Sequence, residues 1–135
     1  MSLFGPDISD DFIKFNNYRV YGTFLLILVN LSSVLEKQST FVAQGALSGL
    51  LDLCQEGSPL IRRLCARALF NLSFDEDSRK AVVAANAVPA LVNLAGLPSE
   101  YIMDLVAAAF CNLSLTDACH GDMVAAGTLP AVIAM

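Results

Sequence analysis

The chain has 135 residues, of which 56% are hydrophobic and 16% charged, so it has enough apolar side chains to form a core and is not a disordered chain. Its formal net charge of −5 disfavours nucleic acid as the main partner, because binding to phosphates requires a basic surface. No apolar run approaches the roughly 20 residues of a membrane-spanning helix, and the acidic start "MSLFGPDISDDF" lacks the pattern of a signal peptide.

These features predict a cytoplasmic or nuclear protein that does not insert into a membrane. The four cysteines are too few and too scattered for a disulfide framework, which favours reduced, mostly structural thiols and agrees with that location. Cys119 and His120 stand side by side, but with one histidine in the chain we predict neither a metal site nor a nucleophile there. No cofactor-binding motif or catalytic motif is present, so the chain is predicted not to be an enzyme.

The tripeptide Asn-Leu-Ser occurs three times at intervals of 41 residues, beginning at Asn30, Asn71 and Asn112. As glycosylation acceptors these sites would indicate a secreted protein. However, residues 64–94 and 105–135 are identical at 11 of 31 positions at the same offset and without a gap. The tripeptide is therefore interpreted as part of an internal repeat.

The elements of the repeat are predicted in chain order. The segment "YRVYGTFLLILVNLSS" has the pattern of a long helix that ends near Asn30. A second long helix is predicted from Pro59 to Leu72, where apolar residues recur at helical spacing and Ser58 stands at the capping position. Ser73 and Glu76 fit a capping box, which predicts a short helix from Ser73 to about Ala85.

Turn residues recur at the same interval. Glycine or asparagine, the residues that most readily end a helix in a left-handed conformation, stands at three equivalent positions: Gly45, Asn86 and Gly127. Pro89 and Pro130 follow as early residues of a medium helix, and a third long helix is predicted over about 99–115. The unit is thus a short, a medium and a long helix, and such units bury their apolar faces only by stacking into an α-solenoid.

Two motifs resemble the armadillo repeat family. The start of its second helix is matched by "AVPALVNLAG" and "GTLPAVIAM", and the end of its third helix by "CARALFNLS" and "VAAAFCNLS". The HEAT repeat, the alternative, lacks the glycine turn and the terminal asparagine. The resemblance implies an all-α, right-handed α-solenoid of about three repeats, interpreted as a fragment of a longer array. Its predicted parts are a leader, tag or partial cap over 1–17, a partial repeat over 18–57, a repeat over 58–97, and a repeat over 98–135 that is truncated in its second helix.

The resemblance also implies a binding site. In the family the third helices line a concave groove, where an asparagine near the end of each helix binds the backbone of an extended peptide; the matching residues are Asn30, Asn71 and Asn112. The alternative is that each asparagine only caps its helix. Where the nuclear-import branch has a tryptophan four residues earlier, this chain has Leu26, Arg67 and Ala108, which disfavours recognition of nuclear-localisation peptides.

Arg63 and Arg67 share a helix face with Asn71, as in the catenin branch, whose basic groove takes acidic peptides. The alternative is a solvated face on which these arginines pair with acidic neighbours such as Asp104, the equivalent of Arg63. We therefore expect a protein-interaction module that binds an extended, acidic peptide segment. Two further hypotheses stay open: a structural segment that self-associates through exposed solenoid ends, and a regulatory repeat region of a larger protein such as a ubiquitin ligase or a ciliary or cytoskeletal protein.

Overall fold

The computed structural model describes residues 26–27, 29–30, 45–55 and 58–135. The leader predicted over 1–17 and most of the first long helix predicted before Asn30 lie outside the described residues. Seven helices follow one another from residue 46 onward, and residues 26–27 and 29–30 are also helical. The helices are α3 (Ala46–Leu53), α4 (Pro59–Leu72), α5 (Glu76–Ala84), α6 (Ala87–Ala95), α7 (Glu100–Ser114), α8 (Asp117–Ala125) and α9 (Thr128–Ala134).

The helices repeat at the interval predicted from the sequence. The starts of α3, α6 and α9 are 41 residues apart, as are those of α4 and α7 and those of α5 and α8. The three predicted turn residues precede α3, α6 and α9 in left-handed conformations, with φ of 76° at Gly45, 64° at Asn86 and 86° at Gly127. The sequence therefore predicted both the period and the backbone conformation that separates the short helices from the medium ones.

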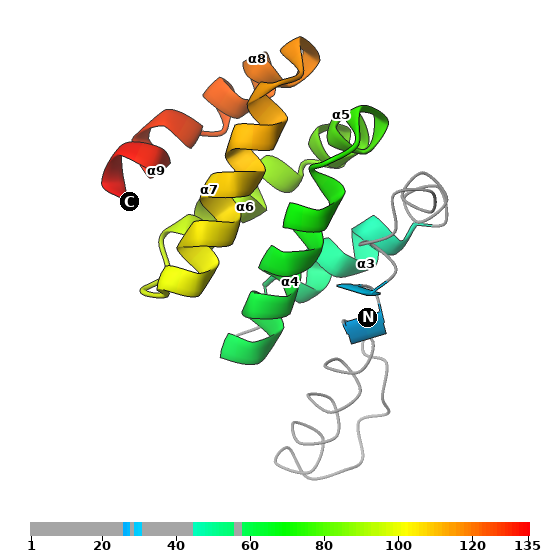
Figure 1. The fold of residues 1–135 in the computed structure, drawn as a ribbon, viewed down its shortest axis with the longest axis vertical. Coiled ribbons are helices and arrows are strands. Elements are labelled where there is room, and N and C mark those ends of the chain that lie inside the picture. The colour runs from blue at the N-terminus through cyan, green and yellow to red at the C-terminus, as the bar shows by residue number, and fades with distance from the viewer. Residues whose placement is uncertain (1–25, 28, 31–44, 56–57) are drawn as a thin grey trace, which may run out of the picture.

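The long helices α4 and α7 pack side by side, with α5 and α8 together at one end of them (Figure 1). The medium helices pass behind in this view, α3 against α4 and α6 against α7, while α9 packs against α6 and α8. Each described helix thus contacts its equivalent in the next unit or the helix that follows it, which is the arrangement of a solenoid. Among the described residues, no helix is both long enough and apolar enough to cross a membrane.

Equivalent positions supply the core in successive units. Ile61, Leu69 and Leu72 of α4 are buried, and so are their equivalents Ile102, Phe110 and Leu113 of α7. The medium helices bury one stripe each: Leu47, Leu50 and Leu53 in α3, and Val88, Leu91 and Leu94 in α6. Since burying one such side chain contributes about 1.5–3 kcal/mol, these stripes hold adjacent helices together.

The equivalent stripe of α9 is exposed. Leu129, Val132 and Met135 occupy the same positions as the buried residues of α6, but they are 60%, 46% and 39% exposed. In α3 and α6 the stripe is covered by the long helix that follows, α4 or α7. The described residues provide no such helix for α9.

One predicted helix start is wrong. The capping box placed the start of the short helix at Ser73, but α5 begins at Glu76 and its N-cap is Asp75, whose Oδ2 accepts a hydrogen bond from the Ser78 N–H at 3.0 Å. Ser73 instead ends α4, and its hydroxyl donates to the Phe70 carbonyl at 2.5 Å. A carboxylate caps the positive end of a helix well, which leaves the serine hydroxyl for the unpaired carbonyls at the end of α4.

The predicted starts of the two later long helices agree with the structure. Ser58 and Ser99 are the N-cap residues of α4 and α7, although only Ser99 accepts a capping hydrogen bond, from the Ile102 N–H at 3.3 Å. Pro59 is the first residue of α4, a position at which the missing proline N–H removes no hydrogen bond.

Candidate partner-binding surface

Two stripes of outward-facing side chains run along α4 and α7, with successive members three or four residues apart. The first consists of Leu60, Arg63, Arg67, Phe70 and Phe74, and the second of Tyr101, Asp104, Ala108, Cys111 and Leu115. Phe70 and Ala108 are half-buried and the others are exposed. Because α4 and α7 lie side by side (Figure 1), the stripes form one surface, which we call the α4–α7 face.

Aromatic rings hold both arginines of this face. The Arg63 guanidinium lies 4.5 Å from the centre of the Tyr101 ring and so bridges α4 and α7, while the Arg67 guanidinium lies 5.6 Å from the centre of the Phe70 ring. Each exposed cation–π contact contributes about 0.5–1 kcal/mol. A guanidinium has five N–H donors in a planar fork, and this geometry lets it bind a carboxylate with two hydrogen bonds.

The alternative, in which these arginines pair with acidic neighbours, is not seen among the described residues. No ion pair joins Arg63 or Arg67 to a carboxylate among the residues that the structure describes, and Asp104 is exposed on α7. Of the other described cations, Lys80 pairs with Glu76 at 3.3 Å and Arg79 binds backbone and hydroxyl oxygens. The positive charge of Arg63 and Arg67 is therefore directed to the solvent side of the α4–α7 face.

The asparagines form lateral contacts between repeats. The Asn71 Nδ2 donates to the Val29 carbonyl at 3.3 Å, and the Asn112 Nδ2 donates to the Ser73 hydroxyl at 2.9 Å. Asn71 is buried, Asn112 is half-buried and Asn30 is exposed. No described residue donates a hydrogen bond to the Oδ1 of Asn112, so this oxygen can accept one from a ligand.

The rest of the Asn-Leu-Ser tripeptide has a structural role in both described copies. Leu72 and Leu113 are completely buried in the core. The serine hydroxyls bind the carbonyl three residues earlier, Ser73 to Phe70 at 2.5 Å and Ser114 to Cys111 at 2.6 Å. Both described copies thus combine an amide contact with the preceding repeat, a core side chain and a hydroxyl at the helix end, although Asn71 binds a backbone carbonyl and Asn112 a side-chain hydroxyl.

Arg79 joins the two repeats at the ends of their long helices. Its Nε donates to the buried Thr116 hydroxyl at 2.7 Å, and its Nη1 donates to the carbonyls of Ser73 and Phe74 at 3.1 and 2.9 Å. Together with the Asn112–Ser73 bond, these contacts tie the end of α4 to the start of α8. We call the three hydrogen bonds donated by Arg79 the Arg79 clamp. The clamp fixes the two long helices that carry the α4–α7 face.

The aromatic residues of the α4–α7 face were not predicted from the sequence. Tyr101, Phe70 and Phe74 were not among the predicted site residues, yet Tyr101 and Phe70 stack on the arginines, and Phe70 packs edge-on against Phe74 with 4.9 Å between ring centres. The signal was present, because extending the Arg63–Arg67 spacing by three and then four residues leads to Phe70 and Phe74. Tyr101 could be found only through the repeat, as the equivalent of Leu60.

The described residues include no group of three or more histidine, cysteine, aspartate or glutamate side chains arranged to hold a metal ion. Cys119 lies buried in α8, where burial raises the pKa of its thiol. The His120 Nε2 lies 2.6 Å from the Ser114 carbonyl, and its Nδ1 is 4.0 Å from the Asp117 carboxylate. The first of these contacts attaches α8 to the end of α7, and the second lies within α8.

Comparisons with known proteins identify the fold. No family model and no curated protein sequence matches the chain. Among solved structures, a designed armadillo repeat protein is 23% identical, with a TM-score of 0.75 over 82% of this chain and 48% of its own. Another, computationally designed for modular peptide recognition, is 23% identical, with a TM-score of 0.76 over 81% of this chain and 47% of its own.

A third match is a designed armadillo repeat protein in complex with the peptide (KR)4; it is 22% identical, with a TM-score of 0.75 over 94% of this chain and 51% of its own. This chain thus spans about half the length of the solved structures it matches. The likeness establishes the fold: the chain is an all-α solenoid of armadillo type, as its sequence predicted.

Proposed function

We propose that the chain is a non-enzymatic protein-interaction module that binds an extended acidic peptide segment of a partner along the α4–α7 face. The observation that carries the proposal is the pair of arginines held over aromatic rings, because Arg63 and Arg67 are exposed and form no ion pair with a described carboxylate. The likeness to armadillo repeat proteins designed for peptide recognition supports the class of partner.

Each side chain of the face has a distinct proposed role. Arg63 and Arg67 bind carboxylates of the peptide, and the rings of Tyr101 and Phe70 orient them. The Asn112 Oδ1 accepts a peptide backbone N–H, which holds the chain of the ligand without selecting its sequence. Asn30, which is exposed, is proposed to do the same one repeat earlier, whereas Asn71 is buried and contributes chiefly through its contact with Val29.

The remaining predicted residues, on α7, lie at the edge of the surface that we propose binds the acidic side chains of the peptide. Asp104 is exposed on α7 and forms no ion pair with Arg63 or Arg67 among the described residues, and the small Ala108 leaves room for a ligand side chain. The designed protein solved with (KR)4 holds a basic peptide. Two arginines would repel such a peptide here, so we propose that the ligand of this chain carries the opposite charge. We also propose that this chain acts in the cytoplasm or nucleus.

The test is a fluorescence-anisotropy titration with a labelled, extended glutamate-rich peptide, repeated across salt concentrations. We expect saturable binding that weakens steeply with added salt, because screening reduces the attraction between exposed charges. A matched lysine-rich peptide should bind at least about 10-fold more weakly, a difference of about 1.4 kcal/mol. Equal binding of both peptides, or binding that does not respond to salt, would contradict the proposal.

The exposed stripe of α9 favours a second function, namely self-association. Leu129, Val132 and Met135 repeat the stripe that a long helix covers in the two preceding units, and Ile133 beside them is 85% exposed. In this second proposal a second copy of the chain covers the stripe of α9. Removing its apolar surface from water lowers the free energy, as it does for the equivalent stripes of α3 and α6.

We expect the mass of the protein in solution, measured by light scattering, to rise with concentration and to stay monomeric in Val132→Glu. Leu115→Glu is the matched control, because Leu115 is also exposed but lies outside α9, and this variant should still associate. A constant monomeric mass of the unaltered chain over the whole concentration range would rule self-association out.

A further inference from the structure

Cys54 and Cys65 meet where the end of α3 packs against α4. Cys54 is the C-cap residue of α3, and its N–H donates to the Leu50 carbonyl at 3.0 Å. The Cys65 thiol, on α4, donates to the same carbonyl at 3.8 Å. The Cys54 backbone and the Cys65 thiol therefore converge on one oxygen atom.

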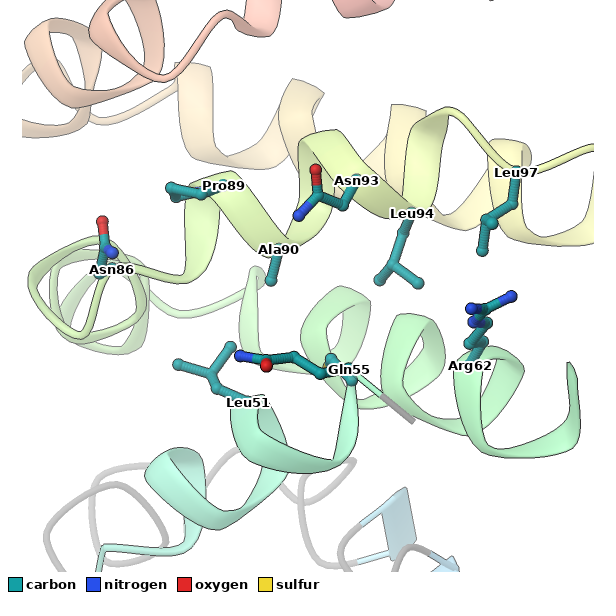
Figure 2. A pocket seen from close by; sticks show the side chains of 10 residues that line it. Leu51, Gln55, Arg62, Asn86, Pro89, Ala90, Asn93, Leu94 and Leu97 are labelled. Atoms are coloured by element: carbon teal, nitrogen blue, oxygen red, sulfur yellow. The ribbon is translucent and has the colours of Figure 1, made fainter. Parts of the chain in front are cut away.

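The two thiols differ in their access to solvent. Cys65 is completely buried, and its pKa is raised far above the usual range by the neighbouring Cys54 side chain and by burial. Cys54 is half-buried and lines a cleft of about 460 Å³ between α3 and α6. In Figure 2, Leu51 and Gln55 lie on one side of this cleft, and Ala90 and Leu94 lie opposite them.

The cleft is large enough for small molecules. Its volume exceeds many times the roughly 30 Å³ that one water molecule occupies in the liquid. A small oxidant can therefore reach Cys54 through the cleft, but it cannot reach Cys65 directly because Cys65 has no exposed surface. This arrangement provides an accessible thiol that reacts first and a buried neighbour that can resolve the product.

We propose that Cys54 and Cys65 form a redox-sensitive pair that closes to an intramolecular disulfide when a small peroxide enters the cleft. The Cys54 sulfur attacks the peroxide, the O–O bond breaks, and hydrogen peroxide yields a Cys54 sulfenic acid and one water molecule. The Cys65 sulfur then attacks the sulfenic sulfur, its proton leaves with the hydroxyl as a second water molecule, and the S–S bond forms. Two thiols are oxidised and one peroxide is reduced.

Closure would attach α3 covalently to α4 and remove the thiol hydrogen bond to Leu50. The other two cysteines occupy different surroundings, since Cys111 is exposed on α7 and Cys119 is buried in α8. The inference is independent of the proposed peptide binding, because none of its atoms belongs to the α4–α7 face.

The test treats the folded full chain with one equivalent of hydrogen peroxide and then measures free thiols, intact mass and disulfide-linked peptides. We expect the thiol count to fall from four to two, the mass to fall by two hydrogen atoms, and one linked pair joining Cys54 to Cys65. Cys111→Ser is the control and should form the same link. In Cys65→Ser the reaction should stop at a Cys54 sulfenic acid, which dimedone traps.

Mapping of the unaltered chain decides the outcome even if Cys65→Ser fails to fold. A stable oxygen adduct on Cys54 beside a free Cys65 thiol would overturn the proposal. So would a disulfide that joins other cysteines, or four thiols that stay reduced.

Discussion

Arg79→Ala is expected to lower the free energy of unfolding by about 2–3 kcal/mol, because hydrogen bonds to a charged group are worth about 1.5–3 kcal/mol and partners left unpaired add a desolvation cost. The variant removes all three bonds of the Arg79 clamp and leaves the buried Thr116 hydroxyl without its donor. Arg79→Lys should recover part of the loss, since an ammonium group keeps the charge but lacks the planar fork that reaches several acceptors. Urea denaturation followed by circular dichroism measures the change.

The matched control is Lys80→Ala, which removes a neighbouring cation. Lys80 forms an exposed ion pair with Glu76 on α5 and contributes about 0–0.5 kcal/mol. If both variants unfold at the same urea concentration as the unaltered chain, the Arg79 clamp does not stabilise the junction between repeats.

Arg67→Glu is expected to weaken binding of a glutamate-rich peptide about 10- to 100-fold, because it replaces a charge-assisted contact with repulsion; losing such a contact alone costs about 1.5–3 kcal/mol. Arg63→Glu should have an effect of similar size, since Arg63 lies one turn earlier on the same stripe and also loses its contact with Tyr101. The folded state should be little affected, because both arginines are exposed. Fluorescence anisotropy measures the dissociation constants.

Lys80→Glu controls for the change in net charge. It alters the charge by the same amount on α5, outside the α4–α7 face, so binding should weaken by less than about 3-fold at physiological salt, where the Debye length is about 8 Å. An equal loss of affinity in Arg67→Glu and Lys80→Glu would mean that overall charge, and not the stacked arginines, attracts the peptide.

The period and the helices could be predicted because they depend on local patterns. Apolar spacing predicted α4 over Pro59–Leu72, and a residue tolerant of positive φ marked the turns at Gly45, Asn86 and Gly127. Each unit repeats these signals at the same offset. A helix boundary that is ambiguous in one unit can therefore be predicted from the equivalent residues of another unit. The buried stripes follow directly from the same spacing.

The start of α5 could not be predicted from local pattern alone. Ser73 and Asp75 can both cap a helix, and the choice depends on tertiary partners. Ser73 is engaged by Phe70 and by Asn112 from the next repeat, so Asp75 becomes the cap. A hydrogen bond between residues 39 positions apart is not visible in a four-residue motif.

The candidate site was predictable only in part for the same reason. The sequence placed Arg63 and Arg67 on one face, but their ring partners depend on how α4 packs against α7. It also treated Asn71 and Asn112 as equivalent, whereas one is buried and the other half-buried. Two cysteines also differ in their exposure to solvent. Cys65 is buried and Cys111 is exposed, although both stand in apolar helical segments.

The most direct test of peptide binding on the α4–α7 face is a residue-resolved NMR titration of the full chain with the glutamate-rich peptide. We expect the largest shifts in the side-chain and backbone signals of Arg63, Arg67, Tyr101 and Asn112, while signals of α5 and α8 away from the long helices stay in place. Shifts confined to the cleft between α3 and α6 or to α9, with the α4–α7 face unchanged at saturation, would contradict it.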